Sequence, residues 1–228
     1  MSCRRERVII RREKIPGLCR PGFAGEDERR AWARRKEGSM KNIILTGMPG
    51  VGKSTIGVIL AKELGYQFVD SDLLIQQQEK MLLKDIIASK GVDGFLAVEN
   101  QVNASIRTER AVIATGGSAV YGKEAMENFK RTGIIVYLQC SYEVLEKRLG
   151  DLKGRGVVLK EGQTLRDIYE ERSVLYEKYA DLVVKEDGRD IEETLALVLE
   201  ELREKQMLQT EPGGPAGADS CISMPKRN

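Results

Sequence analysis

Residues 47–55 read GMPGVGKST. This stretch follows an apolar run, NIILT at 42–46, and leads into a segment with apolar residues at helical spacing over 53–64. Glycines at this spacing, followed by Lys-Ser-Thr and placed between a strand and a helix, match the phosphate-loop pattern. A plain glycine turn joining strand to helix is the alternative, but it does not account for the Lys-Ser-Thr that follows. The stretch predicts an α/β fold with a phosphate site at the end of its first strand.

The glycines of this loop allow backbone N–H groups to turn inward around phosphates, and the N-terminus of the following helix adds partial positive charge. We expect Lys53 to reach the β- and γ-phosphates of ATP as a catalytic group, and the Ser54 hydroxyl to hold Mg²⁺. The residues expected to bind the nucleotide in this loop are Gly47, Gly50, Val51, Gly52, Lys53, Ser54 and Thr55.

Strand and helix patterns alternate between residues 40 and 205. Short apolar runs predict five buried strands, at 42–46, 66–70, 111–115, 134–138 and 181–184. Helical segments are predicted at 53–64, 73–90, 93–108, 122–131, 141–150, 163–178 and 190–205. Parallel strands need crossover connections, so this order predicts a three-layer α/β/α fold with a five-stranded parallel sheet.

Two acids, Asp70 and Asp72, follow the second predicted strand in the segment VDSDLL. Ligands of open α/β sheets bind beyond the carboxyl ends of the strands, so both carboxylates should face the nucleotide. One can orient water on Mg²⁺, and the other can accept the proton of an attacking hydroxyl. The alternative is that Asp72 or Ser71 only caps the helix that follows, which would explain one acid better than two.

A Gly-Gly pair, Gly116 and Gly117, follows the third predicted strand in the segment ATGGSAV. A tight connection from strand to helix would account for the pair, and so would close approach of the backbone to a substrate. Its position at the same predicted sheet edge as the phosphate loop and the two acids favours a role in substrate binding.

A cationic stretch with several glycines, EKRLGDLKGRGVVLKEGQ, covers residues 146–163. A mobile lid of this kind would exclude water and neutralise charge that develops on a triphosphate. Arg148 and Arg155 are the expected lid residues. The lysines are interpreted instead as solvated charges, at Lys147, Lys153 and Lys160.

Composition excludes several classes of function. The chain has no histidine, so His-based acid–base catalysis and His-ligated metal sites are excluded. Four cysteines without CxxC spacing indicate reduced thiols in a cytoplasmic protein. No apolar run approaches the roughly 18 residues of a membrane span, and the N-terminal VII is too short for a secretory signal.

Charge distinguishes the ends of the chain from its middle. Residues 1–40 hold 12 Lys/Arg against 6 Asp/Glu, whereas the remainder holds 25 against 29. Arginine clusters with Pro-Gly breaks predict a disordered extension at 1–39, which either precedes a natural start at Met40 or contacts phosphates without sequence specificity. A second disordered tail is predicted at 206–228, so one catalytic domain is expected at 40–205.

Together these motifs resemble the shikimate kinase family, small phosphate-loop kinases of the nucleoside-monophosphate-kinase-like fold, over about residues 41–205. GMPGVGKST, the VDSD acids, TGGS, the lid arginines and the ending ERSVLYEKYADLVV carry the resemblance. It implies phosphorylation of the 3-hydroxyl of shikimate by ATP with Mg²⁺, in the cytoplasm, by a monomer without a membrane or a specific nucleic-acid partner.

The resemblance also implies roles for individual residues. Asp70 would orient a magnesium-bound water, and Asp72 would bind substrate hydroxyls and is the candidate base. Arg148 would lie near adenine, Arg155 near the phosphates, and Arg172 would hold the substrate carboxylate. The residues expected to bind the substrate are Asp72, Phe95, Leu96, Gly116, Gly117 and Arg172.

The sequence departs from the family pattern at several positions. Ser118 replaces the third glycine of the family's Gly-Gly-Gly, and Gly156 follows Arg155 where proline is usual. More important, the family's Phe-Arg-x-x-Glu reads FLAVE from Phe95 to Glu99, so Leu96 stands where a second carboxylate-binding arginine is expected.

Loss of a buried guanidinium–carboxylate pairing typically weakens binding by about 2–5 kcal/mol. In the family the glutamate of this motif pairs with that arginine, so Glu99 would lose its partner. The site would then prefer a substrate that is neutral or cationic where shikimate carries its carboxylate. The alternative is that Lys90, Arg107 or another cation supplies the missing charge.

Three hypotheses follow for the function. The first is an ATP-dependent kinase of shikimate, or of another small hydroxylated metabolite because of Leu96. The second is a kinase of another subclass. The Pro-Gly of the phosphate loop favours a nucleoside-monophosphate kinase, but the VDSD acids favour a hydroxyl acceptor that must lose a proton. The absence of histidine disfavours a gluconate kinase. The third is a nonenzymatic nucleotide-binding module that uses the arginine-rich extension as its interaction segment.

Overall fold

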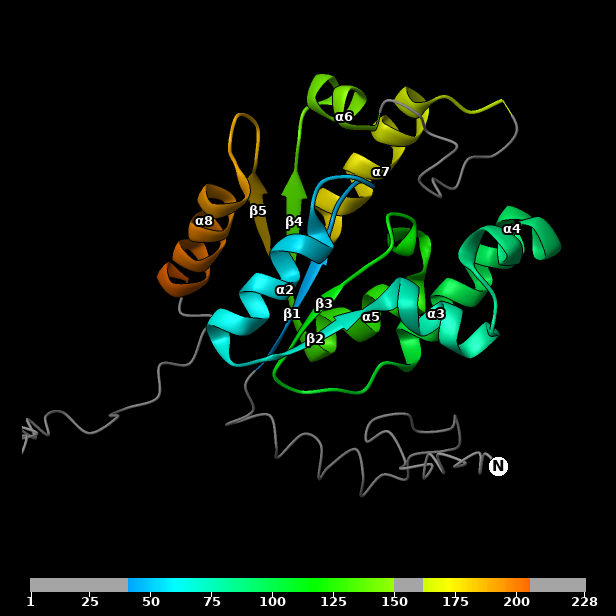
Figure 1. Ribbon diagram of the computed structural model, residues 1–228, viewed down its shortest axis with the longest axis horizontal. Coiled ribbons are helices and arrows are strands. Elements are labelled where there is room, and N and C mark those ends of the chain that lie inside the picture. Colours follow the sequence, from blue (N-terminus) through cyan, green and yellow to red (C-terminus); the bar gives the residue numbers. More distant parts are fainter. Residues whose placement is uncertain (1–40, 150–161, 206–228) are drawn as a thin grey trace, which may run out of the picture.

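The computed structural model describes residues 41–149 and 162–205, which build an open sheet of five parallel strands in the order β2-β3-β1-β4-β5 (Figure 1). The strands are β1 (Asn42–Thr46), β2 (Gln67–Asp70), β3 (Ala111–Ala114), β4 (Gly133–Gln139) and β5 (Leu182–Lys185). The expected parallel sheet is confirmed, and each predicted strand lies within one or two residues of its observed bounds.

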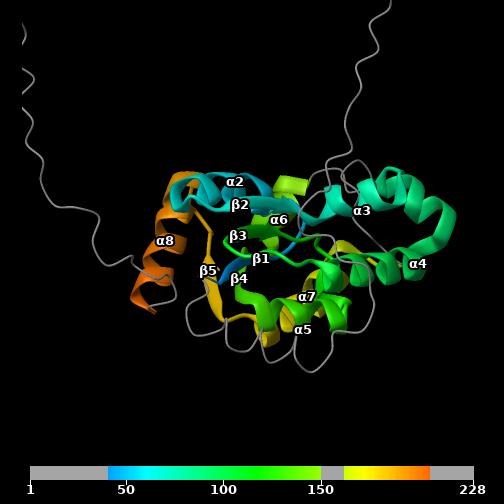
Figure 2. The ribbon, with the colours of Figure 1, turned by 90° about the horizontal axis from the view of Figure 1, so that it is seen from below.

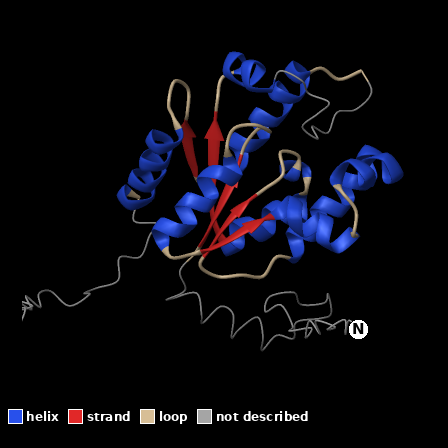
Figure 3. Cartoon of the chain, viewed as in Figure 1, coloured by secondary structure: helices blue, strands red, loops and turns tan. Residues whose placement is uncertain are grey.

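Helices cover both faces of the sheet. They are α2 (Lys53–Leu64), α3 (Ser71–Glu79), α4 (Leu83–Ser105), α5 (Lys123–Thr132), α6 (Tyr142–Leu149), α7 (Leu165–Tyr179) and α8 (Ile191–Glu204), with a short 3₁₀ helix, η2 (Ala119–Tyr121). Figure 2 shows α2 and α8 on one face and α5 and α7 on the other. Helices α3 and α4 extend beyond the β2 side, as the cartoon in Figure 3 also shows. No described helix is long and apolar enough to cross a bilayer.

The central strand β1 divides its side chains between the two faces. Ile43 and Leu45 belong to the apolar core under α2, which includes Leu60, whereas Ile44 packs in a second cluster with Phe129 of α5. Successive side chains of a strand point to opposite faces. A strand that is covered on both faces is therefore apolar throughout, which is why NIILT predicts a buried strand.

The connections that leave β1 and β3 determine where ligands bind. The loop after β1 leads to α2 on one face, and the chain after β3 leads to α5 on the other (Figure 2). Adjacent strands whose connections diverge in this way open a crevice at their carboxyl ends. The phosphate loop and the Gly-Gly pair therefore lie on the two sides of one crevice.

The structure corrects the expected helices at 73–90 and 93–108. The first of these is divided, because α3 ends at Glu79 and Lys80 adopts a left-handed conformation with φ 57°. Lysine is rare in that conformation, so nothing in the local sequence marks the break. The expected break after residue 90 is confirmed, because Gly91 has a non-helical φ of 71° and ψ of 178° and divides α4 into two helical parts at a kink. Ile75 of α3 and Ile86 of α4 belong to the same apolar cluster.

Candidate active site

The phosphate loop is built from glycines that other residues could not replace. Gly47, Gly50 and Gly52 have φ of 143°, 81° and 92°, which L side chains rarely adopt. A Cβ at Gly47 would also lie 2.6 Å from the carbonyl oxygen of Leu138 in the neighbouring strand β4. The loop therefore follows the end of the sheet closely and leads directly into α2.

Lys53 lies inside this loop. Its ammonium donates hydrogen bonds to the carbonyl oxygens of Gly47 (2.8 Å) and Met48 (2.9 Å), and the residue is 8% exposed. Burial lowers the pKa of Lys53 to about 8, an effect that the charge of Asp72 opposes. The side chain is still largely protonated at neutral pH, so the loop holds a positive charge where phosphates would bind.

Ser54 and Asp70 meet beside the loop. The Ser54 hydroxyl donates to Asp70 Oδ2 at 3.0 Å, while Asp70 Oδ1 accepts the backbone N–H groups of Asp72 (3.0 Å) and Leu73 (3.3 Å). Asp70 is thus the N-cap of α3. The interpretation that Asp72 or Ser71 caps this helix is wrong, because the residue at the end of β2 already does so.

Ser71 and Asp72 are consequently available for other contacts. The Ser71 hydroxyl accepts the backbone N–H of Gly116 at 3.1 Å and so links the acid segment to the turn after β3. The pKa of Asp72 is raised to about 6, chiefly by burial and in part by the charge of Asp70, while Lys53 acts in the opposite direction. A carboxylate with a raised pKa is suited to accept a proton near neutral pH.

The two glycines after β3 are sites of close packing. A Cβ at Gly116 would collide with Glu99 Oε1 and would lie 2.7 Å from Asp72 Oδ1. A Cβ at Gly117 would lie 2.8 Å from the ring of Pro49 in the phosphate loop. The turn is therefore tightly packed against the acids and the phosphate loop, and close approach to a substrate stays a prediction.

Arg172 approaches the same crevice from α7. It is 2% exposed, its Nε donates to the Tyr121 hydroxyl at 3.3 Å, and its guanidinium lies 5.3 Å from the centre of the Tyr121 ring. Its charge lowers the pKa values of both Lys53 and Glu99. A buried guanidinium therefore lies within electrostatic range of Lys53 and Glu99, and it contacts a tyrosine that the sequence analysis missed.

The FLAVE segment lies in α4, where its apolar residues and its acid have different surroundings. Phe95 is 2% exposed in the apolar cluster between α3 and α4, and Leu96 packs against the same cluster. Glu99 is 1% exposed, and neither carboxylate oxygen makes a hydrogen bond of ordinary geometry within residues 41–149 and 162–205.

The two cations considered as replacements for the missing arginine form other interactions. Lys90 forms an ion pair with Glu79, and Arg107 donates to the side-chain oxygen of Asn128. Glu99 thus has neither of them as a partner.

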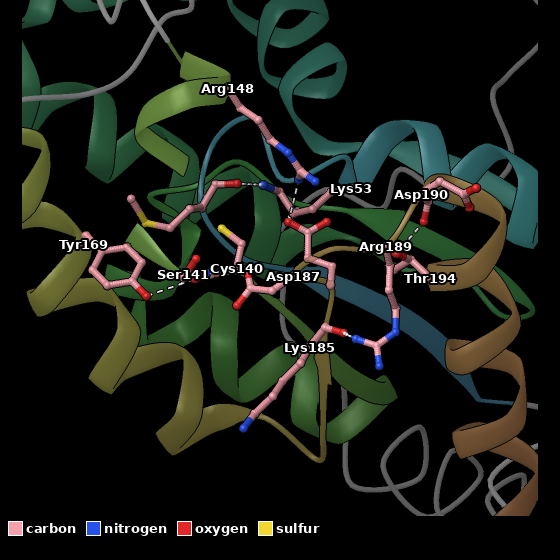
Figure 4. Close-up of polar contacts among 12 residues, drawn as sticks. Lys53, Cys140, Ser141, Arg148, Tyr169, Lys185, Asp187, Arg189, Asp190 and Thr194 are labelled. Carbon is pink, nitrogen blue, oxygen red and sulfur yellow. Dashed lines mark hydrogen bonds and ion pairs between the residues drawn. The ribbon is translucent and has the colours of Figure 1, made fainter. Parts of the chain in front are cut away.

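A second cleft of about 530 Å³ opens between the phosphate loop and the turn after β5. Arg148 of α6 extends across it and pairs with the buried Glu186 at 2.6 Å (Figure 4). Arg155 is the other expected lid residue. It lies outside the described residues, together with the rest of the predicted lid between residues 150 and 161. The lining residues are Gly50, Val51, Gly52, Ile56, Arg148, Glu186, Arg189, Asp190, Ile191, Glu192 and Thr194.

Sequence reasoning missed the wall of this cleft that follows β5. Arg189 donates to the Lys185 carbonyl oxygen at 2.6 Å (Figure 4). Asp190 caps α8. A signal was present, because the turn follows the carboxyl end of a parallel strand, at the same sheet edge as the other motifs. Its acids have different roles, since Glu186 forms an ion pair, Asp187 accepts the backbone N–H of Ser141 and Asp190 caps α8, so composition alone did not distinguish it from an ordinary turn.

Comparisons with known proteins identify the family. The shikimate kinase family model matches residues 49–203. Shikimate kinase 2 of Yersinia pseudotuberculosis is 35% identical over 171 residues, which cover 71% of this chain and 93% of that protein. Shikimate kinase of Thermodesulfovibrio yellowstonii is 34% identical over 165 residues, covering 71% and 95%. The chain belongs to the shikimate kinase family.

Solved shikimate kinases have the same architecture. The enzyme of Acinetobacter baumannii in complex with shikimate superposes with a TM-score of 0.67 at 30% identity, covering 73% of this chain and 95% of that one. The enzyme of Aquifex aeolicus has a TM-score of 0.60 at 28% identity, covering 72% and 98%. As a shikimate kinase family member with an intact phosphate loop, the chain is an ATP-dependent kinase that phosphorylates a hydroxyl group.

Proposed function

We propose that the chain transfers the γ-phosphoryl group of ATP to the 3-hydroxyl of shikimate. The observation that carries the proposal is that three functional groups come together at one sheet edge. Asp72 borders Gly116, Lys53 lies in the phosphate loop, and the buried guanidinium of Arg172 lies within electrostatic reach of Lys53. A phosphate site, a base and an anion site are the groups that this reaction needs.

The residues divide the chemistry among them. Asp72 accepts the proton of the substrate hydroxyl as its oxygen attacks the γ-phosphorus, the bond from that phosphorus to the β,γ-bridging oxygen breaks, and ADP leaves. Lys53 stabilises negative charge on the β- and γ-phosphates. Arg148 contacts the nucleotide from α6, Arg155 acts from the proposed lid, and Arg172 holds the acceptor carboxylate.

Mg²⁺ fits the oxygen pair of Ser54 and Asp70. A hydroxyl and a carboxylate 3.0 Å apart beside the phosphate loop are hard oxygen donors, and Mg²⁺ is usually held by one or two such groups together with phosphates and waters. No group of three or more Cys, Asp or Glu residues suited to a metal occurs in the described part of the chain. Bound there, the ion would neutralise charge on the β- and γ-phosphates.

A panel of acceptors tests this proposal. The protein is incubated with ATP and Mg²⁺ and with shikimate, related uncharged polyols, AMP or CMP, and ADP release is followed by a coupled assay. Release with shikimate well above the background without acceptor is the expected result. Turnover of another alcohol alone would overturn shikimate as the substrate, and turnover of AMP or CMP would show a nucleoside-monophosphate kinase.

One observation favours a second candidate, a hydroxylated acceptor without a carboxylate. Leu96 packs with apolar neighbours, so α4 supplies no guanidinium at this position. The uncharged polyols of the panel test this candidate directly, since they need no carboxylate partner.

Substitution of the proposed base gives a separate test. Asp72→Asn should lower kcat by about 10²- to 10⁴-fold, the range that positioned general bases contribute, with little change in the KM for ATP. Glu127→Gln is the matched control, because Glu127 is an exposed acid of α5. Phosphoryl transfer that is unchanged in Asp72→Asn would refute the role of this carboxylate.

A further inference from the structure

Glu99 is an acid without a described partner in the interior of the site. Its side chain comes from α4 and lies against Gly116, close to Asp72, yet both oxygens lack a hydrogen bond among the described residues. Taking an ionised carboxylate out of water without a partner is so unfavourable that the group becomes protonated instead. The Ser118 hydroxyl lies near enough to oppose this effect in part.

Charged groups from three other helices face Glu99. The pKa of Glu99 is raised to about 7, chiefly by burial and in part by the charge of Asp72 of α3. Arg172 of α7 and Lys53 of α2 act in the opposite direction, and Tyr176 of α7 also lies within electrostatic range. Protonated and ionised Glu99 are thus close in free energy at neutral pH, so a new charge beside it would determine its state.

Leu96 explains why no cation fixes Glu99 in its ionised form. It lies three residues earlier on α4 and therefore on the same side of the helix, but its side chain packs into the apolar cluster with Phe95. An arginine at position 96 could reach Glu99 and hold it as a carboxylate, and leucine cannot.

We propose that Glu99 is a specificity-determining residue that binds the carboxylate of the acceptor as a neutral acid, donating a hydrogen bond while Arg172 supplies the compensating charge. This inference rests on the proposed function, because it takes shikimate as the acceptor. When the substrate anion binds, an ionised Glu99 takes one proton from the solvent, and the acid hydrogen then lies between the Glu99 oxygen and a carboxylate oxygen of the substrate. No bond other than that to the proton is made or broken.

The first experiment measures the protons taken up when shikimate binds. Isothermal titration calorimetry at pH 7.5, in two buffers with different ionisation enthalpies, should show net proton uptake by the wild type. Affinity should fall with rising pH above 7 and approach about tenfold per pH unit, as for one linked proton. Glu99→Gln, whose amide can donate without titrating, should bind shikimate with less proton uptake and a flatter pH profile. The methyl ester of shikimate should bind without Glu99-dependent uptake.

Two further variants complete the comparison. Leu96→Arg should make Glu99 a permanent carboxylate and remove the same linkage, and Glu127→Gln should behave as wild type. Equal proton uptake by the wild type and Glu99→Gln would overturn the inference while leaving the proposed function intact. Failure of the wild type to bind shikimate at any pH would overturn both.

A second measurement concerns the free protein and needs no acceptor. Carboxyl ¹³C NMR of glutamate-labelled protein, with Glu99→Gln to assign the signal, should give a midpoint for Glu99 near pH 7. That midpoint should fall in Leu96→Arg. A wild-type midpoint in the ordinary range for glutamate would overturn the inference whatever the acceptor.

Discussion

Two adjacent glycines pack against different parts of the proposed site, Gly116 against Asp72 and Glu99, and Gly117 against Pro49 of the phosphate loop. We expect Gly116→Ala to displace the carboxyl groups of Asp72 and Glu99, because a Cβ would meet both. Misplacement of catalytic groups by about 1 Å can lower rates about a hundredfold, so kcat and the KM for the acceptor should change most. Gly117→Ala should instead press on Pro49 and raise the KM for ATP. Steady-state kinetics with each substrate varied would distinguish them, and identical profiles would contradict this assignment.

The buried acid Glu99 should make stability depend on pH. Its pKa is 4.5 in the unfolded chain and about 7 in the folded protein, so the folded state binds the proton more tightly. Its stabilising contribution is complete below pH 4.5 and is lost as pH rises through 7. Glu99→Gln should therefore gain about 3 kcal/mol in unfolding free energy, relative to wild type, between pH 4.5 and 8. Urea unfolding of both proteins at pH 4.5 and pH 8 measures this change. The same difference in unfolding free energy between variant and wild type at both pH values would refute the prediction.

The sequence predicts the positions of single residues well where a motif fixes the backbone conformation. It predicts them less well where several side chains could make the same hydrogen bond. Gly47 and Lys53 follow from the phosphate-loop spacing, and the structure places both as expected. The sequence predicts that Asp70 faces the nucleotide, but not that it caps α3. That role depends on which side chain is placed to accept the backbone N–H groups in the first turn of α3. Sequence leaves several candidates for that role, and the backbone angles at the end of β2 select one.

At the level of elements, the kink in α4 is a specific weak point. Gly91 has φ 71° and ψ 178°, a conformation that is essentially restricted to glycine. Gly91→Ala should lower the unfolding free energy by about 1–3 kcal/mol. Because the change lies in the helix that supports Glu99, the KM for the acceptor should rise more than that for ATP. Thermal unfolding together with kinetics tests this, and an unchanged melting temperature would contradict it.

Strands were more predictable than the boundaries of α3 and α4. Each strand is a short apolar run because helices cover both of its faces, and that pattern is visible in sequence. The turn at Lys80 has neither glycine nor proline, and it exists because Ile75 and Ile86 pack against each other across it. A helix break that depends on a tertiary contact cannot be recognised from the residues next to it in the sequence.

At the scale of the whole molecule, the first strand and the last helix of the described residues are both held to the rest of the fold by specific contacts. Asn42, at the start of β1, donates to the carbonyl oxygen of Thr108 at 2.8 Å and accepts the N–H of Ala111 at 3.1 Å. Near the other end, Leu202 of α8 is fully buried in the main apolar core. The family match covers residues 49–203, nearly the same range. We therefore propose that 40–205 is the catalytic domain and that 1–39 and 206–228 are extensions to it.

Deletion of both extensions should leave the enzyme intact. The fragment 40–205 should keep the melting temperature within about 2 °C, since a change of 1 kcal/mol shifts it by about 2–4 °C in a domain of this size. Its kinetic constants should also be preserved. Removal of a segment with 12 Lys/Arg and 6 Asp/Glu should abolish salt-sensitive binding to nonspecific DNA, if the full chain shows any. Loss of acceptor turnover in the fragment, with the melting temperature retained, would instead show that an extension contributes to the site.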